Sequence, residues 1–282
     1  KVLWVIIFCS RVLETSSRFS AHAFGTSSCK MSAKDDDLAQ VTMQAAQQDP
    51  AQFEQQYVHQ VYDIIAPHFS HTRHSPWPKV AEFLMSLEPG SLVADVGCGN
   101  GKYLNVNPSL FMFASDRSAP LASLAVERVG GGGIEMCVAD NLALPYRDGS
   151  MDAVISIAVL HHLASPERRL AGLRELIRVL RPRGKALVYV WAIEQEGRRG
   201  RFSSQDQLIP WHLSNKFRGG TAQPGQEQGV EVPEKHAVEY KRFYHLFAQG
   251  ELEELARTAG GCRVAASYYD HENWCAVVER DD

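Results

Sequence analysis

The chain has 282 residues, of which 45% are hydrophobic and 22% charged, a composition typical of a globular protein. A formal net charge of −4 argues against a protein that holds nucleic acid by bulk electrostatics, although it leaves a local basic patch or a basic partner open. Six cysteines without a C-x-x-C pair argue against a zinc ribbon or a disulfide framework. They indicate reduced thiols in an intracellular protein, so we expect a cytoplasmic location, with the nucleus left open.

Residues 1–54 differ from the remainder of the chain. They begin with an apolar run from Val2 to Cys9, which is too short to span a membrane, and the first methionine is Met31. A signal peptide is one interpretation of residues 1–30, because Lys1 and the apolar run roughly fit that pattern. Upstream sequence or a truncated remnant is the interpretation we prefer. We therefore predict an N-terminal extension over residues 1–54, disordered or non-native, and one folded domain over residues 55–282.

Apolar periodicity predicts the elements of this domain. Apolar residues recur at helical spacing from Val58 to Ile65, Pro67 ends the pattern, and a loop over 68–78 follows. Further helices are expected at 79–86, 121–129, 167–180 and 251–259, and strands at 92–96, 110–115, 134–139, 153–159, 186–191, 263–269 and 274–279. The charged start of the third of these helices, with Arg168 and Arg169, is expected to face solvent. Strands separated by such helices imply right-handed crossovers and a mostly parallel, seven-stranded α/β sheet with helices on both faces.

Residues 195–235 interrupt this alternation. They are polar and rich in glycine, and they contain a basic cluster at Arg198, Arg199 and Arg201. An irregular stretch of this length within a compact domain is usually functional or disordered. Since neither an internal repeat nor a second core is visible, we predict one domain with an irregular insertion.

A glycine-rich loop directly follows the first expected strand. The segment from Asp95 to Lys102 reads D-V-G-C-G-N-G-K, with glycines that allow a tight turn and a close approach of the backbone to a ligand. Dinucleotide-binding proteins use a related loop. Here the acid precedes Gly97 and Gly99 and the full G-x-G-x-x-G is missing, which favours an amino-acid-bearing nucleoside, S-adenosylmethionine, over a pyrophosphate.

Acidic residues end the next two expected strands. Asp116 lies where a carboxylate can accept hydrogen bonds from both ribose hydroxyls, and Asp140 lies where a side chain can contact an adenine edge. The alternative role for both is turn formation or helix capping. Ligands of open α/β sheets bind outside the carboxyl ends of the strands, so three acids at successive strand ends favour a cofactor site. Lys102, Arg117 and Asn141 are the neighbouring candidates for that site.

Several segments resemble one family in detail. The segments V-A-D-V-G-C-G-N-G-K-Y-L, I-S-I-A-V-L-H-H-L, S-Q-D-Q-L-I-P-W-H-L and R-F-Y-H-L-F-A-Q-G-E-L look like those of the tRNA wobble-uridine carboxymethyl methyltransferases. That family includes the stand-alone fungal enzyme and the C-terminal domain of AlkB homolog 8. The resemblance runs from about residue 55 to 280. All class I methyltransferases share the glycine motif, whereas Q-D-Q-L-I-P-W-H and R-F-Y-H are specific to this family.

The resemblance implies a class I S-adenosylmethionine-dependent methyltransferase fold, which is Rossmann-like. It also implies methyl esterification of 5-carboxymethyluridine at the wobble position, with a tRNA anticodon stem-loop as the substrate and no membrane partner. A small activating subunit is implied too, paired with the edge strand of the sheet from Ile134 to Ala139, whose apolar residues suit strand addition. No RNA-recognition motif or iron-dioxygenase domain precedes Met31, so we expect either a stand-alone enzyme or a fragment.

Methyl transfer to a carboxylate sets modest chemical demands. A carboxylate with a pKa near ~4 is ionised at neutral pH, so no general base is needed and positioning supplies the rate. A cation must hold the carboxylate, and the resemblance implies that Arg73 and Arg242 reach the site, where arginine would grip bidentately. His161, after the fourth strand, is a third candidate for contact with the substrate, ahead of His162. Trp211 could stack on a base or pack in the core.

The chain offers little sign of a metal site. His68, His71 and His74 have roughly the spacing of metal ligands, but no acid or cysteine accompanies them. We therefore predict no metal.

Two other functions are consistent with the same fold. A class I methyltransferase that acts on a small molecule would share the glycine loop, but it has no reason to contain Q-D-Q-L-I-P-W-H, Arg73 and Arg242 together. A catalytically silent methyltransferase-fold module that binds a partner or RNA is the other alternative. The acids at the three strand ends argue that cofactor binding, at least, is retained.

Overall fold

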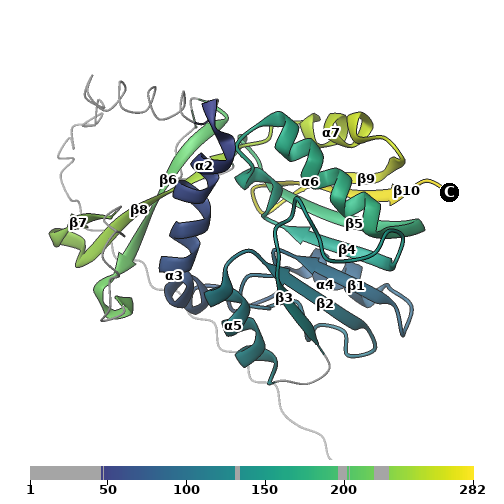
Figure 1. The fold of residues 1–282 in the computed structure, drawn as a ribbon, viewed down its shortest axis with the longest axis horizontal. Helices are drawn as coiled ribbons and strands as arrows, with labels where there is room; N and C mark the ends of the chain where they lie inside the picture. Colours follow the sequence, from purple (N-terminus) through teal and green to yellow (C-terminus); the bar gives the residue numbers. More distant parts are fainter. Residues whose placement is uncertain (1–45, 47, 131–133, 196–201, 203, 219–228) are drawn as a thin grey trace, which may run out of the picture.

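The structure, a computed structural model, describes residues 46, 48–130, 134–195, 202, 204–218 and 229–282. A seven-stranded sheet in the order β3-β2-β1-β4-β5-β10-β9 forms its centre, and a three-stranded sheet lies to one side (Figure 1). Strands β1 to β5 pair in parallel, and β10 is antiparallel to both of its neighbours. The predicted α/β fold with a mostly parallel sheet of seven strands is therefore confirmed.

The elements of the large sheet lie close to their predicted positions. Its strands are β1 (Leu92–Val96), β2 (Phe111–Asp116), β3 (Glu135–Val138), β4 (Met151–Ile157), β5 (Leu180–Trp191), β9 (Cys262–Asp270) and β10 (Asn273–Arg280), and the helices that pack on it are α4 (Pro78–Met85), α5 (Ala119–Val129), α6 (Pro166–Val179) and α7 (Glu251–Ala259). Strand β5 begins directly after α6, earlier than expected. No helix in the described part of the chain combines the length and the apolar character needed to cross a membrane.

Alternate residues of the central strands enter two different apolar cores. Val154 and Val188 belong to a core that includes α6 and α7, whereas Ile155 and Leu187 belong to a core that includes α4 and α5. All four side chains are fully buried. Successive side chains of a strand point to opposite faces, so helices cover the sheet on both faces, as predicted.

A continuous helical segment precedes the large sheet. It consists of α2 (Pro50–Glu54), a π-helical turn η1 (Gln55–His59) and α3 (Gln60–His71). The predicted domain boundary at residue 55 is wrong, because the segment before it is packed against the domain. The Glu54 side chain is buried, and its carboxylate accepts hydrogen bonds from Arg168 Nε and Nη2 at 2.7 and 2.6 Å. The folded domain therefore includes Pro50–Glu54.

The two arginines at the charged start of α6 do not form a solvated surface, although Glu167 before them is exposed, as expected. Arg168 is engaged with Glu54, whose carboxylate also accepts a hydrogen bond from the backbone N–H of Ala164 at 2.7 Å. Arg169 is buried and donates from Nη1 to the carbonyl oxygen of Leu163 at 2.9 Å. The expectation that these arginines face water was wrong because the N-terminal helices cover this end of α6.

Helix α3 continues through Pro67 to His71, so the loop expected from residue 68 begins later. Proline inside a helix removes one hydrogen bond, and contacts beyond the helix compensate for it. The rings of His68 and Phe69 lie 5.3 and 6.1 Å from that of Trp211, which belongs to the three-stranded sheet. The last turn of α3 is therefore held by tertiary packing.

The expected irregular insertion at 195–235 contains two strands, and a third strand that follows it completes a small sheet. Strands β6 (Asp206–Ser214), β7 (Val230–Val232) and β8 (Ala237–His245) form an antiparallel sheet in the order β6-β8-β7. Pro210 is tolerated because β6 is an edge strand. Short helical turns η3 (Asn215–Phe217) and η4 (Pro233–Lys235) follow β6 and β7. The basic cluster predicted at Arg198, Arg199 and Arg201 lies outside the described residues, as do 219–228.

The strand predicted from Ile134 to Ala139 is present as β3 and lies at the edge of the large sheet, as expected. Within the described residues it pairs only with β2, through Phe113 to Asp116. Val138 at its end is 55% exposed. Its outer edge therefore has no strand partner among the described residues.

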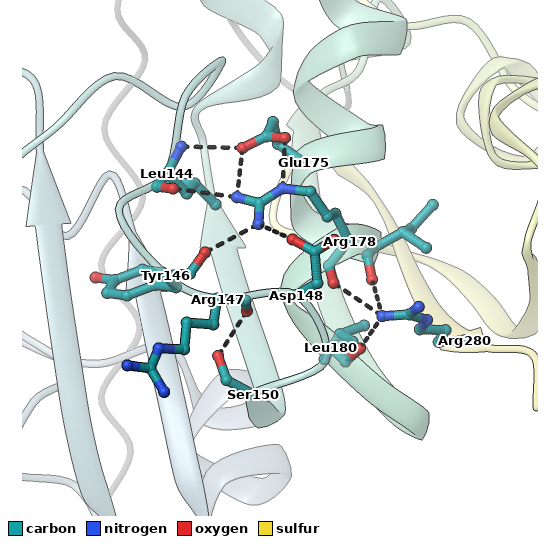
Figure 2. Close-up of polar contacts among 10 residues, drawn as sticks. Leu144, Tyr146, Arg147, Asp148, Ser150, Glu175, Arg178, Leu180 and Arg280 are labelled. Atoms are coloured by element: carbon teal, nitrogen blue, oxygen red, sulfur yellow. Dashed lines mark hydrogen bonds and ion pairs between the residues drawn. The ribbon is translucent and has the colours of Figure 1, made fainter.

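One arginine fixes residues 141–150, which form most of the loop between β3 and β4 (Figure 2). Arg178 of α6 donates to the carbonyl oxygens of Leu144 and Tyr146 at 3.1 and 2.9 Å, and it pairs with Glu175 and Asp148. Glu175 in turn accepts a hydrogen bond from the N–H of Leu144 at 3.0 Å. Because this loop starts at the carboxyl end of β3, the network holds that end of the sheet against α6.

Candidate active site

The glycine loop is closely packed between β1, β2 and β4. Gly97, Gly99 and Gly101 have φ angles of 75°, 56° and 72°, in the region that favours glycine. A Cβ atom on Gly97 would lie 2.3 Å from Cγ2 of Val159. The N–H groups of Gly97 and Cys98 both donate to the carbonyl oxygen at position 115, at 2.8 and 3.0 Å. The loop therefore requires glycine at this turn.

Two of the strand-end acids are buried at this loop. Asp116 accepts hydrogen bonds from the N–H of Gly99 and of Ser118, both at 2.8 Å. Burial raises the pKa of Asp116 to about 6, although these N–H groups oppose the shift. Burial, reinforced by Asp116, raises the pKa of Asp95 to about 8, and Lys102 counteracts this. Oδ2 of Asp95 is buried without a hydrogen-bond partner, so it can accept a proton donor of a ligand.

The third strand end contributes a further unpaired group. Asp140 accepts a hydrogen bond from the N–H of Leu142 at 2.9 Å, and its Oδ2 lies 3.7 Å from Nε of Arg117. Asn141 is buried, and neither its amide oxygen nor its amide nitrogen has a hydrogen-bond partner among the described residues. A side chain with an unpaired donor and an unpaired acceptor is suited to contact a base edge.

One pocket brings the predicted residues together at the carboxyl ends of the parallel strands. It is lined by every predicted cofactor residue and by two of the three predicted catalytic residues: Asp95, Gly97, Gly99, Lys102, Asp116, Arg117, Asp140, Asn141, Arg73 and His161. Arg242 is not among the lining residues. The sequence did not identify Tyr62, Trp77 and Tyr244, which line the same pocket. Lys102 lies over the ring of Trp77 at 4.5 Å, and burial lowers its pKa to about 8.

His161 is held in one tautomer. Its Nδ1 accepts a hydrogen bond from the backbone N–H of Trp191 at 3.0 Å, so the proton of the neutral ring is on Nε2. Burial, reinforced by His162, lowers the pKa of His161 well below its usual value. Nε2 is buried without a partner among the described residues. His161 can therefore donate a hydrogen bond into the pocket, but it is not set up as a base.

His162 has no free nitrogen. Its Nδ1 donates to the carbonyl oxygen of Phe243 at 2.7 Å, and its Nε2 accepts from the hydroxyl of Tyr62 at 2.9 Å. Burial lowers its pKa to about 3, so the ring is neutral. This histidine orients Tyr62 and cannot also bind a substrate.

Arg242 lies behind the aromatic wall of the pocket. Its guanidinium group is 4.7 Å from the ring of Trp211 and 5.2 Å from that of Tyr244, and Nη1 donates to the Tyr62 hydroxyl at 3.3 Å. The residue is only 5% exposed, and Nε has no hydrogen-bond partner. Among the described residues no carboxylate lies within 4 Å of it. Arg242 is thus a buried cation without an anion.

Arg73 lies near the same indole ring as Arg242. Its guanidinium group lies 5.2 Å from the ring of Phe69 and 6.0 Å from that of Trp211. The side chain of Asn100, in the glycine loop, donates to the carbonyl oxygen of Arg73 at 2.9 Å. This hydrogen bond ties the glycine loop to the loop that follows α3. Like Arg242, Arg73 has no ion pair with a carboxylate in the described part of the chain. Two arginines therefore flank one indole ring.

The three histidines with metal-like spacing are engaged in ring contacts. His68 stacks on Phe217 at 4.8 Å, and His71 lies 5.7 Å from His74. Across the described residues, no group of three or more histidine, cysteine or acidic side chains is arranged to hold a metal ion.

Comparisons with known proteins identify the family. Residues 94–188 match the methyltransferase domain family. The chain is 44% identical over 263 residues to the tRNA (carboxymethyluridine(34)-5-O)-methyltransferase alkbh8 of Xenopus tropicalis, with 80% of this chain and 41% of that protein covered. It is 43% identical over 233 residues to the tRNA (carboxymethyluridine(34)-5-O)-methyltransferase of Schizosaccharomyces pombe, with 82% and 99% covered.

The fold has counterparts among solved structures. A Haloferax volcanii methyltransferase in complex with the Trm112 methyltransferase activator is similar with a TM-score of 0.53 and 18% identity, over 78% of this chain and 96% of that one. The chain spans less than half the length of the alkbh8 proteins but almost all of the S. pombe relative. It belongs to the family of the tRNA (carboxymethyluridine(34)-5-O)-methyltransferases.

Proposed function

We propose that the chain methylates the carboxylate of 5-carboxymethyluridine at the wobble position of tRNA, with S-adenosylmethionine as the methyl donor, and that it does so in the cytoplasm. The observation that carries this proposal is the buried guanidinium group of Arg242, which has no carboxylate partner among the described residues. Burying a charge is costly unless it is paired. An anionic substrate supplies the missing partner, and the names of the relatives say which anionic nucleoside those proteins act on.

The pocket residues fit S-adenosylmethionine. Asp95 lies near the end of β1 and Asn141 follows β3, with β2 between them. The unpaired oxygen of Asp95 would find a partner in the amino-acid moiety, and the unpaired amide of Asn141 would find one in the base. Asp116, at the end of β2 between them, retains lone pairs for ribose hydroxyls. When bound, this cofactor supplies an electrophilic methyl group on a sulfonium.

The chain's own residues act by charge and orientation. Arg73 at the pocket and Arg242 behind it create a positive potential in a partly buried site, which favours the ionised form of a carboxylate. His161 offers Nε2–H as a neutral donor. No residue has to remove a proton from an ionised carboxylate, and neither His161 nor His162 is placed to do so. Positioning alone can lower the barrier by about 7–11 kcal/mol.

An activating subunit is the second part of the proposal. The edge of β3 is free to accept a strand from a small partner, and the exposed Val138 gives that edge an apolar end. The H. volcanii structure with the same fold contains an activator of this kind. Val138→Pro would block strand addition at an exposed position that does not line the pocket, so it should abolish co-purification of the subunit.

One experiment tests the proposed reaction. The chain, co-expressed with the activating subunit, is incubated with labelled S-adenosylmethionine and tRNA from cells that lack the wobble methyl ester. Alkali-labile label on the tRNA is the expected result, and tRNA that lacks 5-carboxymethyluridine is the control substrate. Cofactor binding without transfer to any RNA would indicate a silent module, and transfer to a small carboxylic acid alone would indicate the small-molecule reaction.

A further inference from the structure

A cluster of aromatic and basic side chains borders the proposed site on the side of α3. We call it the α3 rim, and it consists of His68, His71, His74, Arg128, Lys216 and Phe217. These residues come from the end of α3, the loop after it, the end of α5 and η3. The segments are far apart in the sequence, but α3 contacts both α5 and η3 (Figure 1).

The rings of the rim form a continuous ledge. His68 stacks on Phe217 with centroids 4.8 Å apart and planes only 19° apart, and His71 lies 5.2 Å from the same ring. On its other side His68 lies 5.3 Å from Trp211, the indole that Arg73 flanks. The ledge therefore leads from the surface directly to the proposed substrate site.

The cations of the rim are not neutralised by acids. Arg128 donates to the carbonyl oxygens of Arg73, at 3.2 Å, and of His74, and its side chain is exposed. Lys216 is exposed on η3. Neither Arg128 nor Lys216 is in an ion pair with a described carboxylate, whereas the next cation along η3, Arg218, pairs with a glutamate at 2.6 Å. A chain with a net charge of −4 thus gathers unpaired positive charge next to its pocket.

We propose that the α3 rim binds the single-stranded nucleotides adjacent to the target uridine, with bases on the ring ledge and phosphates at Arg128 and Lys216. This inference rests on the proposed function, because a base that enters a buried site must leave its neighbours at the surface. Aromatic faces beside unpaired cations suit nucleic acid, since every base can stack and every phosphate carries a charge. A protein partner would have to supply acidic residues opposite both Arg128 and Lys216.

Two substitutions on η3 test the proposal without altering the pocket. Phe217→Ala removes the centre of the ledge, and Lys216→Glu reverses one charge. Arg147→Glu is the matched control, because Arg147 is an exposed cation on the loop of residues 141–150, and its side chain points away from the network drawn in Figure 2. The probe is an anticodon stem-loop RNA that contains 5-carboxymethyluridine, and its Kd is measured by fluorescence anisotropy at low and at physiological salt, with the activating subunit present.

Phe217→Ala should weaken RNA binding about tenfold at both salt concentrations, as expected for the loss of a stacking platform. Lys216→Glu should weaken binding most at low salt and make log Kd less dependent on log salt. Arg147→Glu should bind RNA as the parent chain does, and calorimetric cofactor affinity should be unchanged in all three.

Two results would overturn the proposed role of the α3 rim while leaving the proposed function intact. In the first, the parent chain methylates the stem-loop and both rim variants bind it with parental affinity. In the second, the rim variants lose the activating subunit but keep RNA affinity, which would assign the surface to a protein. If the parent chain itself neither binds nor methylates the RNA, the proposed function has failed before any variant is compared.

Discussion

The guanidinium group of Arg242 is charged in a place that water barely reaches. Its contacts are the faces of aromatic rings and one tyrosine hydroxyl, which offset only part of the lost hydration. The free chain therefore keeps this charge at a cost in stability. Under the proposed function an anionic ligand supplies the compensation, so removing the charge should affect folding and activity differently.

Arg242→Met retains the length of the side chain and removes the charge. Methyl transfer to tRNA should fall ~30-fold or more, since the substrate carboxylate in the site would lose the positive charge of Arg242. The melting temperature of the free chain should stay the same or rise. Cofactor affinity measured by calorimetry should not change, because Arg242 does not line the pocket. A lower melting temperature or a lost cofactor site would show that Arg242 has a structural role instead.

Gly172 shows how a helix position can determine cofactor binding. A Cβ atom there would lie 2.6 Å from Nδ2 of Asn141 and 2.8 Å from Cδ1 of Leu163. Alanine normally stabilises the middle of a helix by about 1 kcal/mol relative to glycine. At this position it would instead displace Asn141, a buried residue that lines the pocket.

We therefore expect Gly172→Ala to weaken S-adenosylmethionine binding and to lower stability, the reverse of the usual sign. Calorimetric titration and thermal denaturation measure the two effects. The control is Ala171→Gly on the exposed side of the same turn. It should cost about 1 kcal/mol of stability and leave cofactor affinity unchanged. A stabilised Gly172→Ala chain with parental affinity would contradict this account of Asn141.

At the scale of elements, the N-terminal helices are fastened to the start of α6 by one carboxylate. Glu54 is 1% exposed and holds Arg168 and the N–H of Ala164. Glu54→Ala should lower the free energy of unfolding by about 3 kcal/mol, as expected when a buried pair loses one partner. Glu254→Ala, which breaks an exposed pair with Arg257 on α7, should cost less than about 1 kcal/mol. Urea unfolding of both variants checks the difference, and equal effects would contradict it.

The sequence predicts elements best where a single periodicity is present. β4 and residues 186–190 of β5 are buried on both faces and form apolar runs, so they were found, whereas the exposed start of β5 was not. β8 was missed because its inward positions include Arg242 among Val238 and Tyr240, and a charged residue conceals the alternation. The polar residues of the insertion concealed β6 and β7 in the same way.

The residues of the site could likewise be predicted only where a local sequence pattern marks them. Residues at strand ends could be predicted, because the carboxyl ends of parallel strands meet at one edge of a sheet. Every predicted cofactor residue lines the pocket for that reason. Tyr62 was recognised only as part of a helical repeat, since its hydrogen bonds to His162 and Arg242 join segments of the chain that no local pattern relates. The buried role of Glu54 was missed for the same reason.

For the whole molecule, the buried Asp95 makes stability depend on pH. Its pKa is raised from 3.8 to about 8 by burial, so the folded chain holds the proton more tightly than the unfolded one. This contribution is fully present at low pH, below the unfolded pKa, and is lost as the pH rises through about 8. A neutral group of the same shape at this position should remove this loss of stability at high pH.

Asp95→Asn should therefore melt at a higher temperature than the parent chain at pH 8, and the difference should shrink as the pH is lowered towards 4. Thermal denaturation without cofactor across this range measures it. Asp281→Asn, an exposed control, should show a difference that does not vary with pH. A variant that is less stable than the parent at pH 8 would show that the Asp95 carboxylate is stabilised by its surroundings.

The π-helical turn from Gln55 to His59 gives the N-terminal helix one residue more than a regular path would need. On one side of it Glu54 is tied to α6, and on the other Tyr62 is tied to His162. A regular α-helix built from the same residues would rotate one anchor relative to the other by about 100°. The π turn absorbs the additional residue, so both anchors are kept. Homologous chains should therefore tolerate the loss of one residue along this turn, with a continuous α-helix in its place, whereas a further insertion there would displace one of the anchors.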